Sequence, residues 1–251
     1  MPLQSIPGHQ VFTHAPIKEA IVDISVADIG ADGLAKLEAL ANTFPEYPNV
    51  QPVRLLKIMN NFNPDGTNNS TSESEIIGYQ FRAADNSELV TCRSQGFSYH
   101  KLKPYTEWQR ILPKAIEGWK KFHDKCQPTI ITKLTVRNIN LIEVPQTTLD
   151  LDEYFEAGPT LPTNIDGPME NFFSRTIINF PEHDTKCNVT FAQQPPQSLG
   201  NAAFVLDIEA FKTVDGILSL TQINEMLTIL NHTKDRVFFG SITQKTKDLF
   251  A

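Results

Sequence analysis

The stretch TVRNINLI, from Thr135 to Ile142, lies in the middle of a long run of strand-forming residues that covers 130–144. Strands disfavour asparagine, and each buried polar group without a hydrogen bond costs on the order of 1–3 kcal/mol. Side chains alternate between the two faces of a strand, so Asn138 and Asn140 share one face and Arg137 lies on the other. The asparagine face is apolar at both of its ends. Three polar residues in such a strand therefore need an explanation.

Two explanations fit these residues. In the first, a β-bulge near Asn138 swaps the two faces, leaves Arg137 at a sheet edge and lets the asparagines bond to neighbouring backbone. In the second, Arg137, Asn138 and Asn140 converge on a ligand or a partner group in a polar pocket between two halves of the protein. The sequence leaves both explanations open.

The periodicity on either side of this strand predicts an α+β protein in which the element order β-α-β-β-β-α is repeated in two successive halves. In the first half, residues 1–128, we expect strands at 19–26, 76–83, 88–94 and 96–102 and helices at 30–44 and 105–125. In the second half, residues 129–251, we expect strands at 130–144, 170–180, 186–193 and 202–211 and helices at 149–155 and 221–240. Each half is predicted to form an antiparallel sheet covered by helices. The polar run at 63–74 is predicted to be a mobile loop.

Composition narrows the class of protein. The 251 residues carry a net charge of −7, of which −1 falls in residues 1–130 and −6 in residues 131–251. This acidity disfavours a nucleic acid as the partner, except at a local basic patch. The three cysteines, Cys92, Cys126 and Cys187, lack the paired spacing of a disulfide framework or a zinc site. Since no apolar run approaches roughly 18 residues and the N-terminus does not resemble a signal peptide, we expect a cytoplasmic protein without membrane contact, cofactor or metal.

No motif in the sequence specifies a chemistry, and we predict no catalytic residue. The segment GFSYH at 96–100 resembles G-x-S-x-G, but a histidine replaces the last glycine, so Ser98 is expected to be an ordinary strand serine. The glycine-rich motifs that bind phosphate are absent. His232 is the most notable of the six histidines, because it lies on a predicted helix that otherwise faces the core. It is either a binding residue or a core histidine bonded to a backbone carbonyl.

The predicted helix at 105–125 carries a basic face opposite its apolar stripe. From residue 97 to 125 there are 7 basic and 3 acidic residues. The basic residues that recur at helical spacing or lead into the helix are Lys101, Lys103, Arg110, Lys114, Lys121 and Lys125. A solvated exterior would explain this face. The alternative is contact with an anionic partner, either an acidic protein or a nucleic acid.

Several segments, in this order, resemble one protein family. They are APIKEAIVDISV (15–26), GFSYHKLKPYTEW (96–108), TVRNINLIEVP (135–145), LDEYF (151–155) and LNHTKDRVFFGSIT (230–243). Across most of its length the chain resembles a sporadically distributed family of uncharacterised bacterial and archaeal proteins of similar size. In that family an aromatic residue follows the strand arginine, where this chain has Asn138. The resemblance implies a shared fold and a prokaryotic origin, and the sporadic distribution suggests an accessory or defence-type system.

Two classes of function are compatible with these observations. The first, which we favour, is a non-enzymatic interaction or binding module whose partner is another protein, such as the product of a neighbouring gene. The second is an enzyme that acts on an anionic, nucleotide-like small molecule in a pocket between the halves. The candidate binding residues are Arg137, Asn138, Asn140 and His232. The sequence does not predict an oligomeric state.

Overall fold

The computed structural model describes residues 3, 5–30, 32–62, 68–105, 107–145, 150–156, 158–162, 164, 167 and 169–251. The strands are β1 (Ile17–Val26), β2 (Asn49–Phe62), β3 (Asn68–Arg82), β4 (Glu88–Arg93), β5 (Gly96–Leu102), β6 (Ile131–Pro145), β7 (Phe173–Phe180), β8 (Thr185–Gln194) and β9 (Asn201–Gly216). The helices are α1 (Gly33–Glu38), α2 (Trp108–Cys126), α3 (Leu220–Ser241) and α4 (Gln244–Asp248), with short 3₁₀ turns η1 (Ala39–Asn42) and η2 (Leu151–Glu153).

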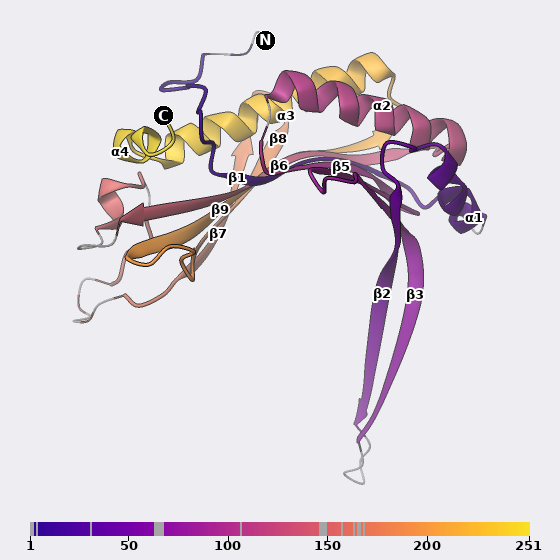
Figure 1. Ribbon diagram of the computed structural model, residues 1–251, viewed down its shortest axis with the longest axis horizontal. Helices are drawn as coiled ribbons and strands as arrows, with labels where there is room; N and C mark the ends of the chain where they lie inside the picture. The colour runs from indigo at the N-terminus through magenta and orange to yellow at the C-terminus, as the bar shows by residue number, and fades with distance from the viewer. Residues whose placement is uncertain are drawn as a thin grey trace.

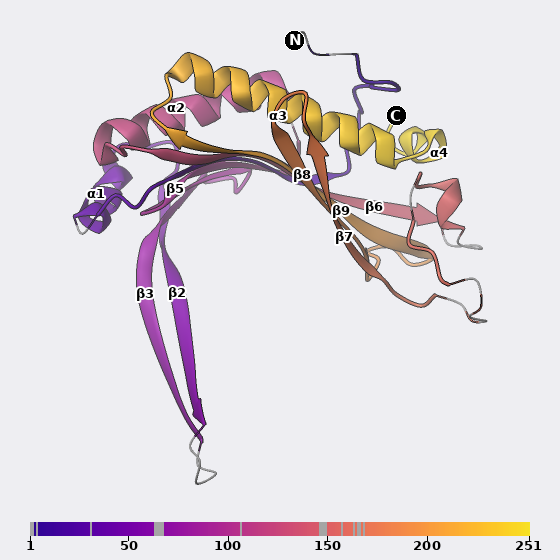
Figure 2. The ribbon, with the colours of Figure 1, turned by 180° about the vertical axis from the view of Figure 1, so that it is seen from behind.

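One antiparallel sheet contains all nine strands, in the order β2-β3-β4-β5-β1-β6-β9-β8-β7. The long helices α2 and α3 lie across one face of this sheet, as Figures 1 and 2 show from opposite sides. No helix of the described chain covers the other face, which we call the open face. The sheet curves away from the helices at both ends, so that the β2–β3 hairpin projects as a long arm on one side (Figure 1).

Strand β6 is an internal strand of the sheet, because it pairs with β1 on one side and with β9 on the other. Its even-numbered residues from Leu134 to Val144 are all buried under the helices. The alternation is unbroken through Asn138, so the β-bulge that the first of the two explanations requires there is absent. The register shift nearest to Asn138 lies instead in β1, between Ile17 and Glu19, opposite the Ile139–Asn140 region of β6. Arg137 is therefore in a central strand and not at an edge.

The core forms between the helices and the covered face of the sheet. Helix α2 buries Ile111, Ala115, Trp119 and Phe122 along one stripe. Phe97 of β5 meets this stripe, with its ring centroid 6.3 Å from that of Trp119. Burial of each such side chain stabilises the fold by roughly 1.5–3 kcal/mol. Helix α3 begins with a capping box between Ser219 and Gln222, which satisfies two backbone N–H groups at its start.

The α+β class and the long helices agree with the sequence-based expectations, whereas the two expected sheets are one. The first strands of the two halves, β1 and β6, pair antiparallel and join all the other strands into a single sheet. This pairing depends on contacts between residues more than a hundred positions apart, which neither half's periodicity reveals. The division into 1–128 and 129–251 stays a prediction.

The polar run at 63–74 is also corrected in part. Residues 68–74 belong to β3 and pair with β2, a strand that sequence periodicity did not predict, whereas residues 63–67 lie outside the described chain. In this arm Ser72 pairs with Ile58 and Ser74 with Leu56. Backbone pairing with the neighbouring strand holds the polar run in β3, so it needs no apolar periodicity of its own.

Candidate ligand-binding site

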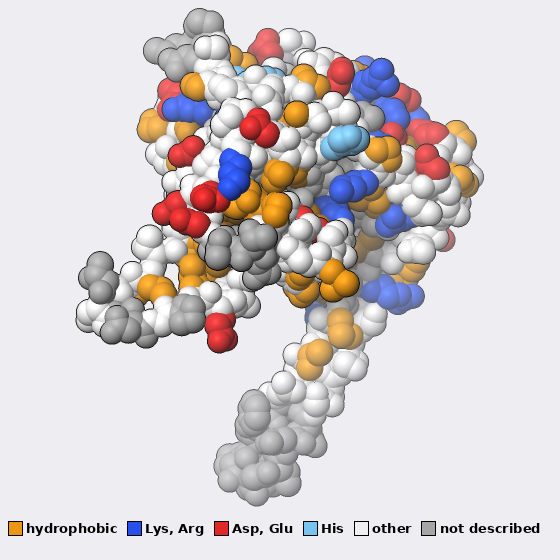
Figure 3. Space-filling view, turned by 60° about the vertical axis from the view of Figure 1, so that its left-hand side comes forward, with side chains coloured by type: hydrophobic (Ala, Val, Ile, Leu, Met, Phe, Trp, Pro, Cys, Tyr) orange, Lys and Arg blue, Asp and Glu red, His pale blue; other side chains and the backbone are white. Residues whose placement is uncertain are grey.

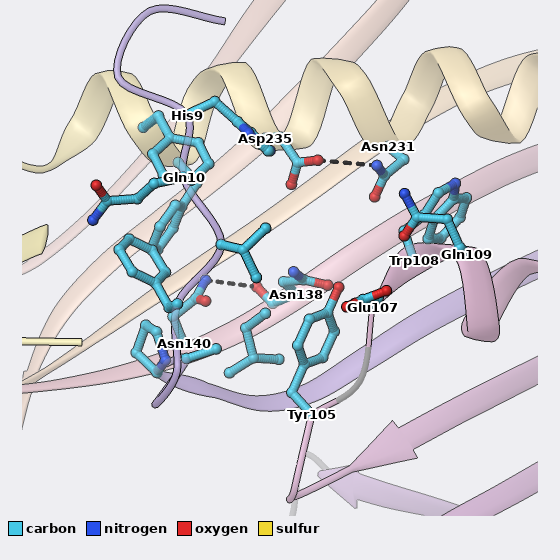
Figure 4. Close-up of a pocket in the computed structure, with 17 residues that line it drawn as sticks. His9, Gln10, Tyr105, Glu107, Trp108, Gln109, Asn138, Asn140, Asn231 and Asp235 are labelled. Atoms are coloured by element: carbon cyan, nitrogen blue, oxygen red, sulfur yellow. Dashed lines mark hydrogen bonds between the residues drawn. The ribbon is translucent and has the colours of Figure 1, made fainter. Parts of the chain in front are cut away.

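A pocket of about 210 Å³ lies between the covered face of β6, the start of α2, helix α3 and an N-terminal segment at 9–17 (Figure 4). Four elements that are distant in sequence contribute its lining. Strand β6 supplies Asn138 and Asn140, and helix α3 supplies Asn231 and Asp235. The two asparagines singled out in the sequence thus face into one pocket.

Asn140 is 1% exposed and forms part of the pocket floor. Its amide nitrogen donates to the carbonyl oxygen of Leu206 on β9 at 2.8 Å, and to that of Asn138 at 3.3 Å. Its amide oxygen is buried and has no donor among the described residues. The nitrogen side of this amide is therefore satisfied by backbone, while the oxygen side lacks a partner.

Helix α3 adds a buried ion pair behind the floor. The ammonium of Lys234, a residue that is 2% exposed, donates to Asp235 Oδ1 at 2.8 Å. One orientation of the Asn138 side-chain amide gives both its oxygen and its nitrogen a hydrogen-bond partner. In this orientation Oδ1 accepts from Lys234 Nζ at 2.9 Å, and Nδ2 donates to the Arg137 carbonyl oxygen at 3.0 Å. Lys234 thereby ties the helix to the central strand.

Asn231 completes this polar set one turn earlier on α3. Its amide nitrogen donates to Asp235 Oδ2 at 2.9 Å, so both carboxylate oxygens of Asp235 are engaged. Its amide oxygen, like that of Asn140, is buried without a donor among the described residues. Figure 4 shows Asn231 reaching from the helix towards β6. Two residues that line the pocket, Asn140 and Asn231, therefore each carry a buried amide oxygen without a donor in the described chain.

The charges at the floor compensate one another. Burial opposes the charged form of Lys234, but the adjacent Asp235 carboxylate more than offsets it and raises the pKa of this lysine above its ordinary value. Burial also raises the pKa of Tyr105, although the charge of Lys234 opposes this shift. Lys234 is therefore a cation paired with the Asp235 carboxylate, and Tyr105 is a neutral phenol. No lysine or arginine is among the described residues that line the pocket.

Aromatic side chains form much of the pocket wall. Phe12 of the N-terminal segment packs on Phe239 of α3, with ring centroids 5.7 Å apart, and Phe238 lies 5.3 Å from Phe239. Tyr105 and Trp108 line the opposite side, before and at the start of α2 (Figure 4). An apolar wall around a few polar groups is the usual composition of a small-molecule site.

Arg137 does not join the two asparagines. Its side chain lies on the open face, where Nε donates to Asp207 Oδ1 at 2.7 Å and Nη2 to Asp207 Oδ2 at 2.5 Å. His232 is half-buried on α3 beside Asn231, and it is not among the lining residues. Of the four candidate binding residues, the structure brings two together in the pocket.

Glutamate side chains form ion pairs with part of the predicted basic face. Lys101 is buried, with Nζ 3.8 Å from Glu88, and Lys114 pairs with the same carboxylate at 2.5 Å. Lys121 pairs with Glu46 at 2.6 Å. The three remaining residues are exposed: Lys103, Arg110 and Lys125. Half of the six residues thus form ion pairs within the chain.

Ser98 lies in a chain of hydrogen bonds on the open face. Its hydroxyl oxygen is 2.9 Å from Nε2 of His100, and Nδ1 of His100 is 2.6 Å from the Glu19 carboxylate. The order of groups is that of a serine, a base and an acid, but Ser98 is only 3% exposed and lines none of the described pockets. A nucleophile must be reached by its substrate. This arrangement therefore couples β5 to β1 and does not form an open catalytic site.

Sequence reasoning missed Tyr105, Asn231, Lys234 and Asp235. A usable signal was present in LNHTKD, because a lysine falls on the apolar stripe of α3, between Leu230 and Val237. A lysine on a buried stripe requires a counter-charge nearby. That requirement points to Asp235 and to a polar group on the facing strand.

Comparisons found no matching family, no matching curated protein and no matching solved structure. The resemblance to a sporadically distributed prokaryotic family therefore stays a prediction. Within the described residues, no group of three or more His, Cys, Asp or Glu side chains is arranged to hold a metal ion. The described helices also include none that is long and apolar enough to span a bilayer.

Proposed function

We propose that this protein is a binding module that holds a small molecule bearing N–H donors in the pocket between β6, α2, α3 and the N-terminal segment. The single observation that carries the proposal is the pair of buried amide oxygens, on Asn140 and Asn231, that have no donor in the described chain. Each such acceptor costs on the order of 1–3 kcal/mol unless an occupant of the pocket donates to it.

The lining defines the chemical class of the occupant. Its aromatic wall, made by residues such as Phe12 and Trp108, suits a flat apolar body, and its volume of about 210 Å³ suits a ring-sized molecule. Glu107 at the start of α2 adds a negative charge that no ion pair of the described chain neutralises. A planar ring that carries an amide or amidine group would match both the acceptors and this charge.

The same features weigh against an anionic, nucleotide-like ligand. Lys234 already donates to Asp235 and Asn138, and it lies behind the floor. A phosphate or carboxylate would meet the unpartnered oxygens of Asn140 and Asn231, which repel it because all of these groups are acceptors. The enzyme alternative, which required an anionic substrate here, finds no support in this lining.

Three probes of one shape test the proposal: benzamidine, benzamide and benzoate, measured by ligand-observed NMR and by competition with one another. We expect benzamidine to bind most tightly, benzamide less tightly and benzoate least, because N–H donors decrease and negative charge appears along this series. Asn231→Leu should weaken benzamidine binding about tenfold, which corresponds to about 1.4 kcal/mol for one lost hydrogen bond.

The control is Asn224→Leu, an exposed asparagine on the same helix and outside the pocket lining. It should leave the affinity for benzamidine unchanged. Equal binding of benzoate and benzamidine, or an Asn231→Leu variant with unchanged affinity, would contradict the proposal. Absence of binding by all three probes would also contradict the proposed class of ligand.

We also propose that the two halves arose from one repeated unit. The strand order around the β1–β6 junction supports this: reading outwards, one side runs β1, β5, β4, β3 and the other β6, β9, β8, β7. In chain order, each half has one strand at the junction, then a short helical element, then three more strands and finally a long helix. The short elements are α1 and η2, and the long helices are α2 and α3. Superposition of residues 17–126 on 131–241 should match six elements in order, with β2 as an addition to the first half. A match of fewer than four elements would rule out the duplication.

A further inference from the structure

Strands β2 and β7 form the two edges of the sheet, and β2 belongs to the arm that projects from the body. Figures 1 and 2 show the β2–β3 arm leaving the domain without another described element beside its distal part. An isolated two-stranded hairpin is marginally stable at best in water. An edge strand of 14 residues also presents a row of free N–H and C=O groups.

The distal part of the arm exposes large apolar side chains. Leu56 is 60% exposed, Ile58 59% and Met59 52%, and they lie within four consecutive positions of β2. Orange side chains on the projecting arm are visible in Figure 3. Because side chains alternate along a strand, Leu56 and Ile58 share one face of the arm and Met59 lies on the other. Exposed apolar side chains on an otherwise polar projection are typical of an interaction surface.

The opposite edge of the sheet shows the same property. Phe173 is 72% exposed and Ile177 61%, and both belong to β7. The arm and β7 lie at opposite ends of the sheet, and both project from the face that the helices leave open (Figure 1). One molecule therefore carries both an apolar arm and an apolar edge, separated by the width of its open face.

We propose that a second copy of this chain covers both surfaces, with the arm of each copy lying against β7 of the other about a twofold axis. A twofold rotation that turns one open face towards the other brings each arm to the partner's β7. The same contact then forms twice and closes the assembly. No apolar edge is left to extend a fibre.

The area agrees with a stable dimer. At ~3.4 Å per residue, the ten residues at 53–62 span ~34 Å, and a two-stranded ribbon is ~10 Å wide. One arm can thus cover ~340 Å², and each copy both provides an arm and receives one. The resulting ~700 Å² per copy is close to the ~800 Å² that a standard interface buries on each partner.

The charge on the arm favours a copy of this chain over a nucleic acid. Arg54 and Lys57 on β2 are matched by Glu73 and Glu75 on β3, so the described strands of the arm carry no net charge beyond Val53. Lys57 and Glu75 also pair with each other at 2.8 Å. A nucleic acid needs unmatched positive charge to gain affinity, and an apolar arm without net charge offers none.

Mass measurement of the full chain by light scattering and analytical ultracentrifugation is the first test. The wild type should be a dimer, and Ile58→Lys and Ile177→Lys should each raise the dimer dissociation constant at least a hundredfold. Ile217→Lys is the matched control, because Ile217 is 86% exposed in the β9–α3 turn, outside the proposed interface. It should remain a dimer.

Cross-linking then identifies which surfaces meet. An Ile58→Cys chain mixed with an Ile177→Cys chain should form a disulfide-linked pair under mild oxidation. The native thiols of Cys92, Cys126 and Cys187 are buried and should not react in the folded protein. Because only the mixed sample places one new thiol on an arm and the other on β7, its cross-link is specific to the proposed contact.

Three results would overturn the proposal. A monomeric wild type would show that no second copy covers the arm. Unchanged dimerisation in both lysine variants would place the interface elsewhere. Faster cross-linking of Ile58→Cys alone than of the mixed sample would show that arm meets arm. Circular dichroism of each lysine variant distinguishes loss of the dimer from loss of the fold.

Discussion

Arg137 and Asp207 are diagonal neighbours on adjacent strands of the open face, and they form a two-point ion pair across the β6–β9 junction. The hydrogen bond to Asp207 is the main cause of a raised pKa for Arg137, so the guanidinium stays charged. The pair lies on the opposite side of the sheet from the pocket. Arg137 thus stabilises the sheet and does not contact an occupant of the pocket.

Replacing this arginine should therefore change stability without changing binding. Arg137→Ala leaves the Asp207 carboxylate, which is only 16% exposed, without its partner. Because the arginine side chain itself is 38% exposed, we expect a loss of about 1–2 kcal/mol in the free energy of unfolding, less than for a fully buried pair. Urea denaturation measures this loss, and the benzamidine affinity should stay within twofold of wild type.

A double-mutant cycle with Asp207→Ala separates the pair from its surroundings. If the two single losses simply add in the double variant, the ion pair contributes no coupling energy and this prediction is wrong. An Arg137→Ala variant that folds normally but loses benzamidine binding would instead place the arginine in the binding site.

How far the sequence predicts the site depends on the signal at each residue. Alternation along β6 correctly assigns Asn138 and Asn140 to one face and Arg137 to the other, because the strand period is a local property. The pocket as a whole was not predictable, since Tyr105, Asn231 and the N-terminal segment meet β6 only through tertiary packing. The same limit applies to Asp207, which lies 70 positions from Arg137 in the chain.

The fold shows the same division between local and long-range information. The long helices were predicted because their apolar stripes are intrinsic to their sequences, as with Trp119 and Phe122 in α2. Strand β2 was missed because the arm is exposed on both faces over most of its length, so it has no buried face to create alternation. The single sheet was missed because pairing of β1 with β6 leaves no trace in either strand alone.

The buried ion pair of α3 gives a second prediction. Lys234→Met removes the partner of Asp235 and the donor to the Asn138 amide oxygen. We expect the free energy of unfolding to fall by about 2–4 kcal/mol, because a partly buried carboxylate is left uncompensated. Lys234→Met combined with Asp235→Asn should recover most of this loss in urea denaturation. Equal stabilities of the single and double variants would contradict the explanation.

Acid sensitivity at the β1–β5 junction is a third prediction. The hydrogen bond from His100 is the main cause of a lowered pKa for Glu19. A carboxylate with a lowered folded-state pKa stabilises the protein above its ordinary pKa, and this contribution is lost as the pH falls through the folded-state value. Glu19→Gln should therefore be less stable than wild type by about 1 kcal/mol at pH 7, since the pair is partly exposed.

This difference should shrink as the pH is lowered from about 5 to 3, where the wild-type carboxylate becomes protonated. Urea midpoints of wild type and Glu19→Gln across this range give the measurement, and taking their difference cancels other acidic groups, such as Glu209. A difference that stays constant down to pH 3 would show that ionisation of Glu19 does not stabilise the fold.

The close approach of α2 to the sheet at Gly118 gives the last prediction. Replacing an interior helix glycine by alanine usually stabilises a protein by up to about 1 kcal/mol. Here a Cβ atom would lie 2.6 Å from Cζ of Phe97, whose ring is fully buried beside Trp119 and Phe122. Overpacking of this kind costs about 1–3 kcal/mol, so Gly118→Ala should be destabilising by about 1 kcal/mol after the helix gain is subtracted.

Gly240→Ala is the matched control in α3, because no atom lies within 4 Å of the added Cβ, and it should raise the thermal midpoint. If both alanine variants were stabilised equally, the contact between Gly118 and Phe97 would not constrain how closely α2 packs on the sheet.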